Sequence, residues 1–269
     1  MPDSLELAAI QTALAETLFA GKIQLFPSIG STNTYAMQQG ASGAPNGSVY
    51  IAEEQTAGRG RSDHAWHSEP CAGLYVSVLL RPAIVPADAL WLSLAAGIAA
   101  QQAVENVTAM VADIRWPNDL MFGSRKFGGV LTEMNAEATR VRYAVIGIGI
   151  NVNHTRFPSE LAGLATSLRL ESGRTVSRQD LLIALLLNLQ QELKGVLNGA
   201  ALEDATRSIL QRLTEKSSWI EGKRVSVEEA GGYTGVTAGL DARGFLRVQT
   251  ADGIRTVLSG GVRDFRPGD

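Results

Sequence analysis

From residue 55 the sequence reads Gln55-Thr56-Ala57-Gly58-Arg59-Gly60-Arg61, and Trp66 follows after four further residues. Glycines allow the backbone to turn tightly and to present its N–H groups to an anion. Interleaved arginines add fixed positive charge and forked donors that suit carboxylates and phosphates, and Trp66 can stack on a ring. The stretch predicts a loop that closes over an anionic substrate and a nucleotide. A flexible Arg-Gly surface loop is the alternative that the stretch alone leaves open.

Two glycine-bearing strands follow further along the chain. Residues 126–133 begin with Lys126 and include Gly128 and Gly129, and residues 147–153 alternate glycine with isoleucine and end in asparagines. Glycines weaken a strand interior, so they often mark the close approach of a ligand or another backbone. We expect strands over 127–133 and 143–150 to form a hairpin connected at 135–139. One face of the second strand is then bare backbone.

Two short polar segments also interrupt the apolar pattern. Ser31-Thr32-Asn33 offers two hydroxyls and an amide in a row, and Trp116-Pro117-Asn118-Asp119 places an amide and a carboxylate after a proline. Helix capping explains one residue of the first segment. An Asx-type turn is the structural alternative for the second.

The first 216 residues predict an α+β domain. Leu7, Ile10, Leu14 and Leu18 recur at helical spacing, which predicts a helix over residues 4–19 that ends at Gly21. The other predicted elements are helices over 31–39, 86–104, 178–196 and 202–213, and strands over 23–26, 49–53, 74–80 and one that ends at Pro117.

The composition changes near Ser217. Short β-rich runs separated by glycine-bearing turn pairs follow, over 224–228, 235–240, 245–250 and 254–258. Strands so short and so close together predict a small barrel. We therefore divide the chain into a domain of residues 1–216 and a C-terminal β-barrel of residues 217–269.

The overall composition excludes several classes of protein. A net charge of −3 among 269 residues argues against bulk nucleic-acid binding. The single cysteine, Cys71, excludes an internal disulfide and fits a reducing compartment. The apolar runs are too short for a membrane span and no signal peptide is evident, so we expect a cytoplasmic protein. His64, His67 and Cys71 do not place a fourth ligand, so no metal site is predicted.

Taken in order, five segments resemble the biotin protein ligases, also called biotin–[acetyl-CoA-carboxylase] ligases. They are Ser-Thr-Asn, Gln-x-x-Gly-Arg-Gly-Arg, Trp-Pro-Asn-Asp, Lys-x-Gly-Gly-x-Leu-x-Glu and Gly-x-Gly-x-Asn. The resemblance extends over essentially the whole chain. It implies an α+β fold: a catalytic domain like those of class II aminoacyl-tRNA synthetases and biotin ligases, with a C-terminal SH3-like β-barrel.

The resemblance also implies a two-step reaction. Biotin and MgATP give biotinyl-5′-AMP and pyrophosphate, and a lysine of the biotin carboxyl carrier domain of acetyl-CoA carboxylase then takes the biotin. The first step brings a carboxylate to a triphosphate, so the cations of Arg59, Arg61 and Lys126 and the Mg²⁺ ion must offset the repulsion. The adenylate hydrolyses easily, so a loop must close over it.

The resemblance assigns the site residues in three groups. Biotin binding falls to Ser31, Thr32, Asn33, Gln55, Gly58, Arg59, Lys126 and Gly128. Nucleotide binding falls to Arg61, Trp66, Asn118, Lys126 and Asn151, with Trp66 packed on adenine. The catalytic group is Lys126, Arg59, Arg61 and Asp119, and Asp119 orients either the incoming lysine amine or the metal.

One stretch departs from the family pattern. Many members carry a further glycine and a basic residue before the tryptophan, where this chain has Ser62-Asp63-His64-Ala65. An extra cationic phosphate contact then depends on a protonated His64.

Three other functions compete with biotin ligation. A ligase that also represses transcription would need more than the single helix expected before the first strand. A lipoate or octanoate ligase shares the fold, but lipoate has no ureido ring for the polar residues to bind. A non-catalytic RNA-binding protein is disfavoured by the negative net charge. The sequence leaves the oligomeric state open.

Overall fold

A seven-stranded sheet forms the framework of the larger domain in this computed structural model, which describes residues 4–61, 64–198 and 201–265. The strand order is β1-β2-β3-β7-β6-β5-β4. β1 and β2 pair in parallel and every other neighbouring pair is antiparallel. In chain order the strands are β1 (Ile23–Phe26), β2 (Ser48–Ala52), β3 (Gly73–Leu80), β4 (Asp113–Arg115), β5 (Asp119–Phe122), β6 (Arg125–Ala136) and β7 (Val141–Asn151).

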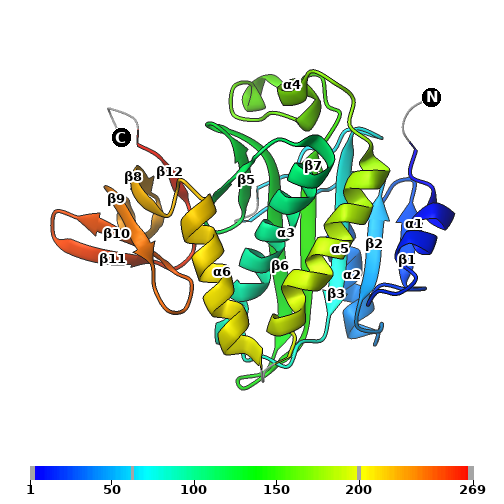
Figure 1. The fold of residues 1–269 in the computed structure, drawn as a ribbon, viewed down its shortest axis with the longest axis horizontal. Coiled ribbons are helices and arrows are strands. Elements are labelled where there is room, and N and C mark those ends of the chain that lie inside the picture. The colour runs from blue at the N-terminus through cyan, green and yellow to red at the C-terminus, as the bar shows by residue number, and fades with distance from the viewer. Residues whose placement is uncertain (1–3, 62–63, 199–200, 266–269) are drawn as a thin grey trace.

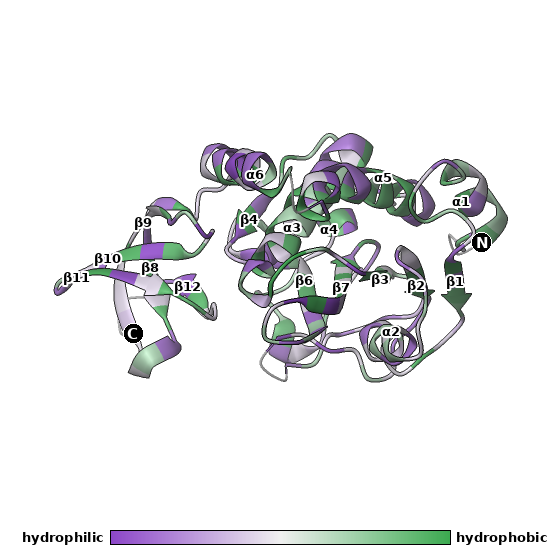
Figure 2. Cartoon of the chain, turned by 90° about the horizontal axis from the view of Figure 1, so that it is seen from below, coloured by the Kyte–Doolittle hydropathy of each residue, from purple (hydrophilic) through white to green (hydrophobic). Residues whose placement is uncertain are grey.

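Helices cover both faces of this sheet (Figures 1 and 2). The long helices α3 (Leu90–Thr108) and α5 (Arg178–Val196) pack against each other on one face, and α2 (Thr32–Ala41) lies on the other. Because both faces are covered, every residue of β2 and β3 is buried. The remaining helices are α1 (Leu7–Ala13), α4 (Leu168–Ser172) and α6 (Leu202–Lys216). None of the described helices combines the length and the apolar character that crossing a lipid bilayer requires.

The central hairpin is confirmed, since β6 and β7 pair antiparallel from Gly128↔Ile150 to Ala136↔Val141. Both strands are longer than predicted, so the connection is residues 137–140 and not 135–139. The first helix was predicted too long: α1 spans Leu7–Ala13, and turns occupy residues 14–21. Gly21, with φ of +68°, therefore lies in the turn before β1 and does not end the helix. Strand β5 was missed, because its four residues follow directly on the predicted turn.

The C-terminal part forms a five-stranded antiparallel sheet, consistent with an SH3-like domain, in the order β11-β10-β9-β8-β12. Four strands were predicted, and the short β12 was not. The strands are β8 (Glu221–Val227), β9 (Tyr233–Leu240), β10 (Leu246–Thr250), β11 (Gly253–Val257) and β12 (Val262–Asp264). Because α6 ends at Lys216, we propose the boundary between Lys216 and Ser217.

Buried contacts join the two sheets. The indole N–H of Trp116 donates to Gly244 O at 2.9 Å, and the hydroxyl of Ser217 donates to Ile114 O at 2.6 Å. Gly244 has φ of +84°, and a Cβ there would lie 2.9 Å from Leu94 Cδ1. One apolar core runs through both sheets. This packing fixes the C-terminal sheet beside the β4–β5 edge of the larger one (Figure 1).

Candidate active site

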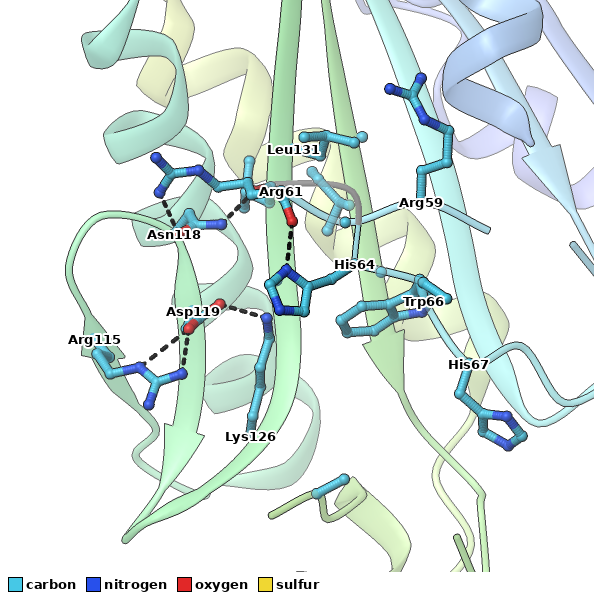
Figure 3. Close-up of a pocket in the computed structure, with 18 of the residues that line it drawn as sticks. Arg59, Arg61, His64, Trp66, His67, Arg115, Asn118, Asp119, Lys126 and Leu131 are labelled. Atoms are coloured by element: carbon cyan, nitrogen blue, oxygen red, sulfur yellow. Dashed lines mark hydrogen bonds and ion pairs between the residues drawn. The ribbon is translucent and has the colours of Figure 1, made fainter. Parts of the chain in front are cut away.

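A cavity of about 630 Å³ opens at the end of the sheet where the glycine-rich segments lie (Figure 3). The N-terminus of α2, the loop around residues 55–67, the β4–β5 turn and strands β6 and β7 all contribute to its walls. Eleven of the predicted site residues line it: Ser31, Thr32, Asn33, Gln55, Arg59, Arg61, Trp66, Asn118, Asp119, Lys126 and Asn151.

Two predicted biotin contacts, Gly58 and Gly128, are not among the described residues that line the cavity. A Cβ on Gly58 would lie 2.7 Å from Trp66 O, and one on Gly128 would lie 2.8 Å from Leu120 Cδ1. Both glycines therefore permit close packing behind the cavity wall.

The polar end of the cavity is built at the start of α2. Ser31 is the N-cap, and its hydroxyl accepts a hydrogen bond from Thr34 N. The Thr32 backbone N–H and hydroxyl donate to Gln55 Oε1 at 2.8 and 3.0 Å. Asn33 Nδ2 donates to Leu131 O at 3.3 Å. The Ser-Thr-Asn run thus combines a cap with two side chains held in fixed orientations.

Sequence reasoning missed two members of this polar network. Ser77 Oγ lies 2.8 Å from Thr32 Oγ1 and 2.7 Å from Asn33 Oδ1, and Glu133 Oε2 accepts from Asn33 Nδ2 at 2.9 Å. Ser77 is the only polar residue in the stretch 76–80. This polar residue in an apolar strand could have indicated a site residue. A buried hydroxyl needs a partner, and here the partners are the site residues themselves.

Strand β7 turns a backbone face without side chains toward the cavity, as its glycines predicted. A Cβ on Gly147 would lie 2.1 Å from Asn33 Oδ1, and one on Gly149 would lie 2.6 Å from Trp66 Cε2. Asn33 and the Trp66 indole occupy the space that side chains would fill. The indole N–H of Trp66 is buried and has no hydrogen-bond partner in the described part of the chain.

The charged end of the cavity centres on Asp119. Lys126 Nζ lies 2.5 Å from Asp119 Oδ1, and Arg115 donates to Oδ2 through Nε at 3.0 Å and through Nη2 at 2.5 Å (Figure 3). Burial by itself would raise the pKa of the Asp119 carboxyl, but the charges and hydrogen bonds of Lys126 and Arg115 hold that pKa below its ordinary value. Arg115 was not predicted, since as the last residue of a short strand it carried no motif.

The two loop arginines have different partners. Arg59 Nη1 lies 3.1 Å from Glu133 Oε1, and Figure 3 shows its guanidinium directed away from Lys126. Arg61 Nη1 donates to Asn118 Oδ1 at 3.0 Å, and its Nη2 donates to Ser259 O in the C-terminal sheet domain. The structure therefore brings Arg61 to Asn118, another residue predicted to bind the nucleotide, but places Arg59 beside the polar network.

The two asparagines are held by backbone carbonyls. Asn118 Nδ2 donates to Val130 O at 2.8 Å, and Asn151 Nδ2 donates to Thr166 O at 3.1 Å. The Asn118 amide is held from both ends, because its Oδ1 accepts from Arg61 Nη1.

The C-terminal domain contributes six residues to the cavity wall, none of which was predicted: Glu228, Ser259, Gly261, Val262, Arg263 and Asp264. Arg263 Nε lies 2.7 Å from Glu228 Oε1. No motif marks these positions, because the fold alone brings them to the site.

The histidines lie at two places. His64 Nδ1 is 2.9 Å from Arg61 O, while Ser62 and Asp63 lie outside the described residues. His154 is fully buried, and its ring centroid lies 5.8 Å from that of His67, which lines the cavity. Burial, followed by the charge of His67, lowers the pKa of His154 to about 4, so its ring is neutral at pH 7.

The fold and the cavity together agree with a protein ligase. The α+β domain carries an antiparallel C-terminal sheet, and the cavity joins a polar network to a cationic end. A model of the biotin/lipoate A/B protein ligase family matches residues 25–151, and a model of the biotin protein ligase C-terminal domain matches residues 221–262. The chain belongs to the biotin protein ligase family.

Similar proteins agree with this assignment. The bifunctional ligase/repressor BirA of Bacillus spizizenii is 35% identical over 86% of this chain and 70% of the relative. The biotin–[acetyl-CoA-carboxylase] ligase of Mycobacterium tuberculosis is also 35% identical, over 85% of this chain and 83% of the relative. The structure of a biotin protein ligase from Aquifex aeolicus in complex with biotin and ATP matches with a TM-score of 0.76 and 28% identity, covering 90% of this chain and 97% of that one.

Proposed function

We propose that this protein activates biotin with ATP to biotinyl-5′-AMP and transfers the biotin to one lysine of a biotin carboxyl carrier domain, that of acetyl-CoA carboxylase, in the cytoplasm. Relatives named as biotin ligases, and a similar structure that holds biotin and ATP, support the proposal. The observation that carries it is the position of Lys126. Its ammonium lies in the same cavity as the polar network, 5.3 Å from the centroid of the Trp66 ring.

The polar end suits the ureido ring of biotin. That ring offers two N–H donors and one carbonyl acceptor, which match the carbonyl and hydroxyl groups of Thr32, Asn33 and Gln55. A site built to hydrogen-bond such a ring discriminates against analogues that lack it, because those analogues forgo these hydrogen bonds. Lipoate is such an analogue.

The cationic end suits the first step, in which a carboxylate oxygen of biotin bonds to the α-phosphorus of ATP and pyrophosphate leaves. Lys126 is placed to neutralise the charge that collects on the carboxylate and the α-phosphate. Arg61 and Asn118 stand on the nucleotide side. Mg²⁺ prefers oxygen donors, so the amide oxygens of Asn118 and Asn151 are the groups that would hold an Mg²⁺ brought with ATP, which would supply further charge neutralisation.

In the second step the carrier amine bonds to the acyl carbon and AMP leaves. The amine must be deprotonated to attack. Asp119 is a poor base for this proton, since its pKa is held below the ordinary value. We therefore assign Asp119 to orienting Lys126 and the incoming amine.

The test uses the purified protein with biotin, MgATP and an apo carrier domain, and follows the mass of the carrier. We expect biotin to be added at one lysine, with AMP and pyrophosphate released. Parallel reactions with lipoate and octanoate should leave the carrier and a lipoyl domain unmodified. Acylation by lipoate in preference to biotin would overturn the proposal, and so would a carrier that stays unmodified while the protein is folded.

A further inference from the structure

Two of the three histidines of the chain meet a glutamate at the edge of the cavity. One ring nitrogen each from His67 and His154 and a carboxylate oxygen of Glu69 all lie within 4.8 Å of one another. His67 and Glu69 follow Trp66 in the loop before β3, whereas His154 follows β7. The fold brings the three together across more than eighty residues of sequence, and neither ligation chemistry nor the polar network uses Glu69 or His154.

The surroundings hold His154 in place. Its backbone carbonyl accepts from Ser167 Oγ at 2.7 Å, and its ring stacks on Phe157 with centroids 5.3 Å apart. The Tyr75 hydroxyl lies 3.5 Å from His154 Nε2 and already donates to Glu69 O at 3.1 Å. The proton of the Tyr75–His154 contact must then come from the imidazole, which leaves the lone pair on Nδ1.

That second ring nitrogen is a buried acceptor without a partner. His154 is fully buried, and its Nδ1 makes no hydrogen bond to any residue that the structure describes. A buried polar atom left without a partner costs free energy, so such an atom in a folded protein calls for an explanation such as a bound water or ion. The imidazole of His67 and the carboxylate of Glu69 lie close to the His154 ring, and a metal ion held by the three residues would account for this atom.

We propose that His67, Glu69 and His154 bind one divalent transition-metal ion of the zinc class. Two imidazole ligands favour zinc over magnesium and calcium, which prefer oxygen. Ligand atoms around a tetrahedral zinc are separated by about 3.3 Å. Small side-chain rotations would bring the three ligand atoms to that separation. Three protein ligands leave one position for water, as in known two-histidine, one-glutamate sites.

The ion would tie the loop that carries Trp66 to the segment after β7. Since His67 is next to Trp66 in sequence and also lines the cavity, metal binding would restrict the same loop that covers the substrates. The site is separate from the magnesium that accompanies ATP, because Asn118 and Asn151 contribute nothing to it.

The test measures metal binding directly. The full-length protein is treated with chelator and titrated with ZnCl₂ by calorimetry without nucleotide, and CoCl₂ is added in parallel to follow its visible d–d bands. We expect one equivalent of zinc and the band intensity of a four-coordinate cobalt ion. Glu69→Gln and His154→Phe should each weaken zinc binding by about 10-fold or more, since even loss of an outer-shell partner costs about 10–100-fold.

Two variants serve as controls. His64→Ala removes the histidine outside the triad, and Cys71→Ser removes the single cysteine; both should bind zinc as the unmodified protein does. If His154→Phe fails to fold, Glu69→Gln, which keeps size and shape at a half-buried position, still decides the question. Unchanged zinc affinity in Glu69→Gln, binding lost in either control, or no binding by the unmodified protein would overturn the site. None of these results depends on biotin ligation.

Discussion

The ammonium of Lys126 on β6 lies 2.5 Å from Oδ1 of Asp119 on the neighbouring strand β5. Before any substrate arrives, the lysine that faces the cavity is thus already paired and oriented. Arg115 holds the other carboxylate oxygen, so Asp119 stays ionised without taking all of its charge compensation from Lys126. A carboxylate or phosphate entering the cavity therefore meets a cation that is fixed in direction.

Lys126→Ala should abolish adenylate formation and leave the fold intact. The loss of a charge that stabilises the transition state costs about 10² or more in rate. Biotin-dependent exchange of pyrophosphate into ATP measures the step. Arg125→Ala is the matched control, because Arg125 is paired with Glu171 at 2.8 Å and is not one of the residues lining the cavity. Exchange within a few-fold of wild type in Lys126→Ala would remove this lysine from the chemistry.

Asp119→Asn should lower the free energy of unfolding, and the size of the loss should depend on pH. The folded protein holds the pKa of Asp119 below its ordinary value of about 3.9. The stabilisation is therefore complete above about pH 4 and is lost as the pH falls through the folded pKa. Urea unfolding should show wild type more stable than the variant by about 2 kcal/mol near pH 7. A gap that widens as the pH falls below about 4 would contradict the assignment.

Arg61→Gly should keep adenylation and release biotinyl-AMP. Arg61 joins the loop to Asn118 and to Ser259, and without these bonds we expect the loop to stay open longer. The consequence is biotin on bystander lysines in a mixture of proteins, detected by blotting. Labelling confined to the carrier lysine would show that Arg61 does not retain the intermediate.

Gly149→Val should displace the Trp66 indole, since even a Cβ at this position would lie 2.6 Å from the ring. Overpacking of this kind destabilises the fold by about 1–3 kcal/mol, and the misplaced indole should slow adenylation by up to about 100-fold. Gly97→Ala in α3 is the matched control, because the nearest atom to a Cβ there would be Ile114 Cγ2 at 3.9 Å. That substitution should raise stability by up to about 1 kcal/mol. Adenylation at the wild-type rate in Gly149→Val would mean that the reaction does not require the Trp66 indole to pack on β7.

The local elements and the motif residues could be predicted from the sequence, and the partners of those residues could not. The predicted helix over 178–196 matches α5, in which Ser177 caps the N-terminus and leucines form the buried face. Glu133 stood in a quoted motif, yet only the pairing of β6 with β7 and the position of α2 bring it to Asn33. Glu228 and Arg263 reach the cavity because two sheets pack together, and no local pattern records that packing.

The Arg61 guanidinium belongs at once to the loop, to the larger domain and, through Ser259 O, to the C-terminal domain. Closure of the loop and binding of a partner to the C-terminal domain both involve this group, so the two equilibria are coupled, and such coupling is reciprocal. A protein that binds only the C-terminal domain would alter the affinity for an intermediate under the loop, and the intermediate would alter the affinity for that protein by the same factor. Binding of a protein to the C-terminal domain, outside the cavity, would therefore change how firmly the intermediate is held inside it.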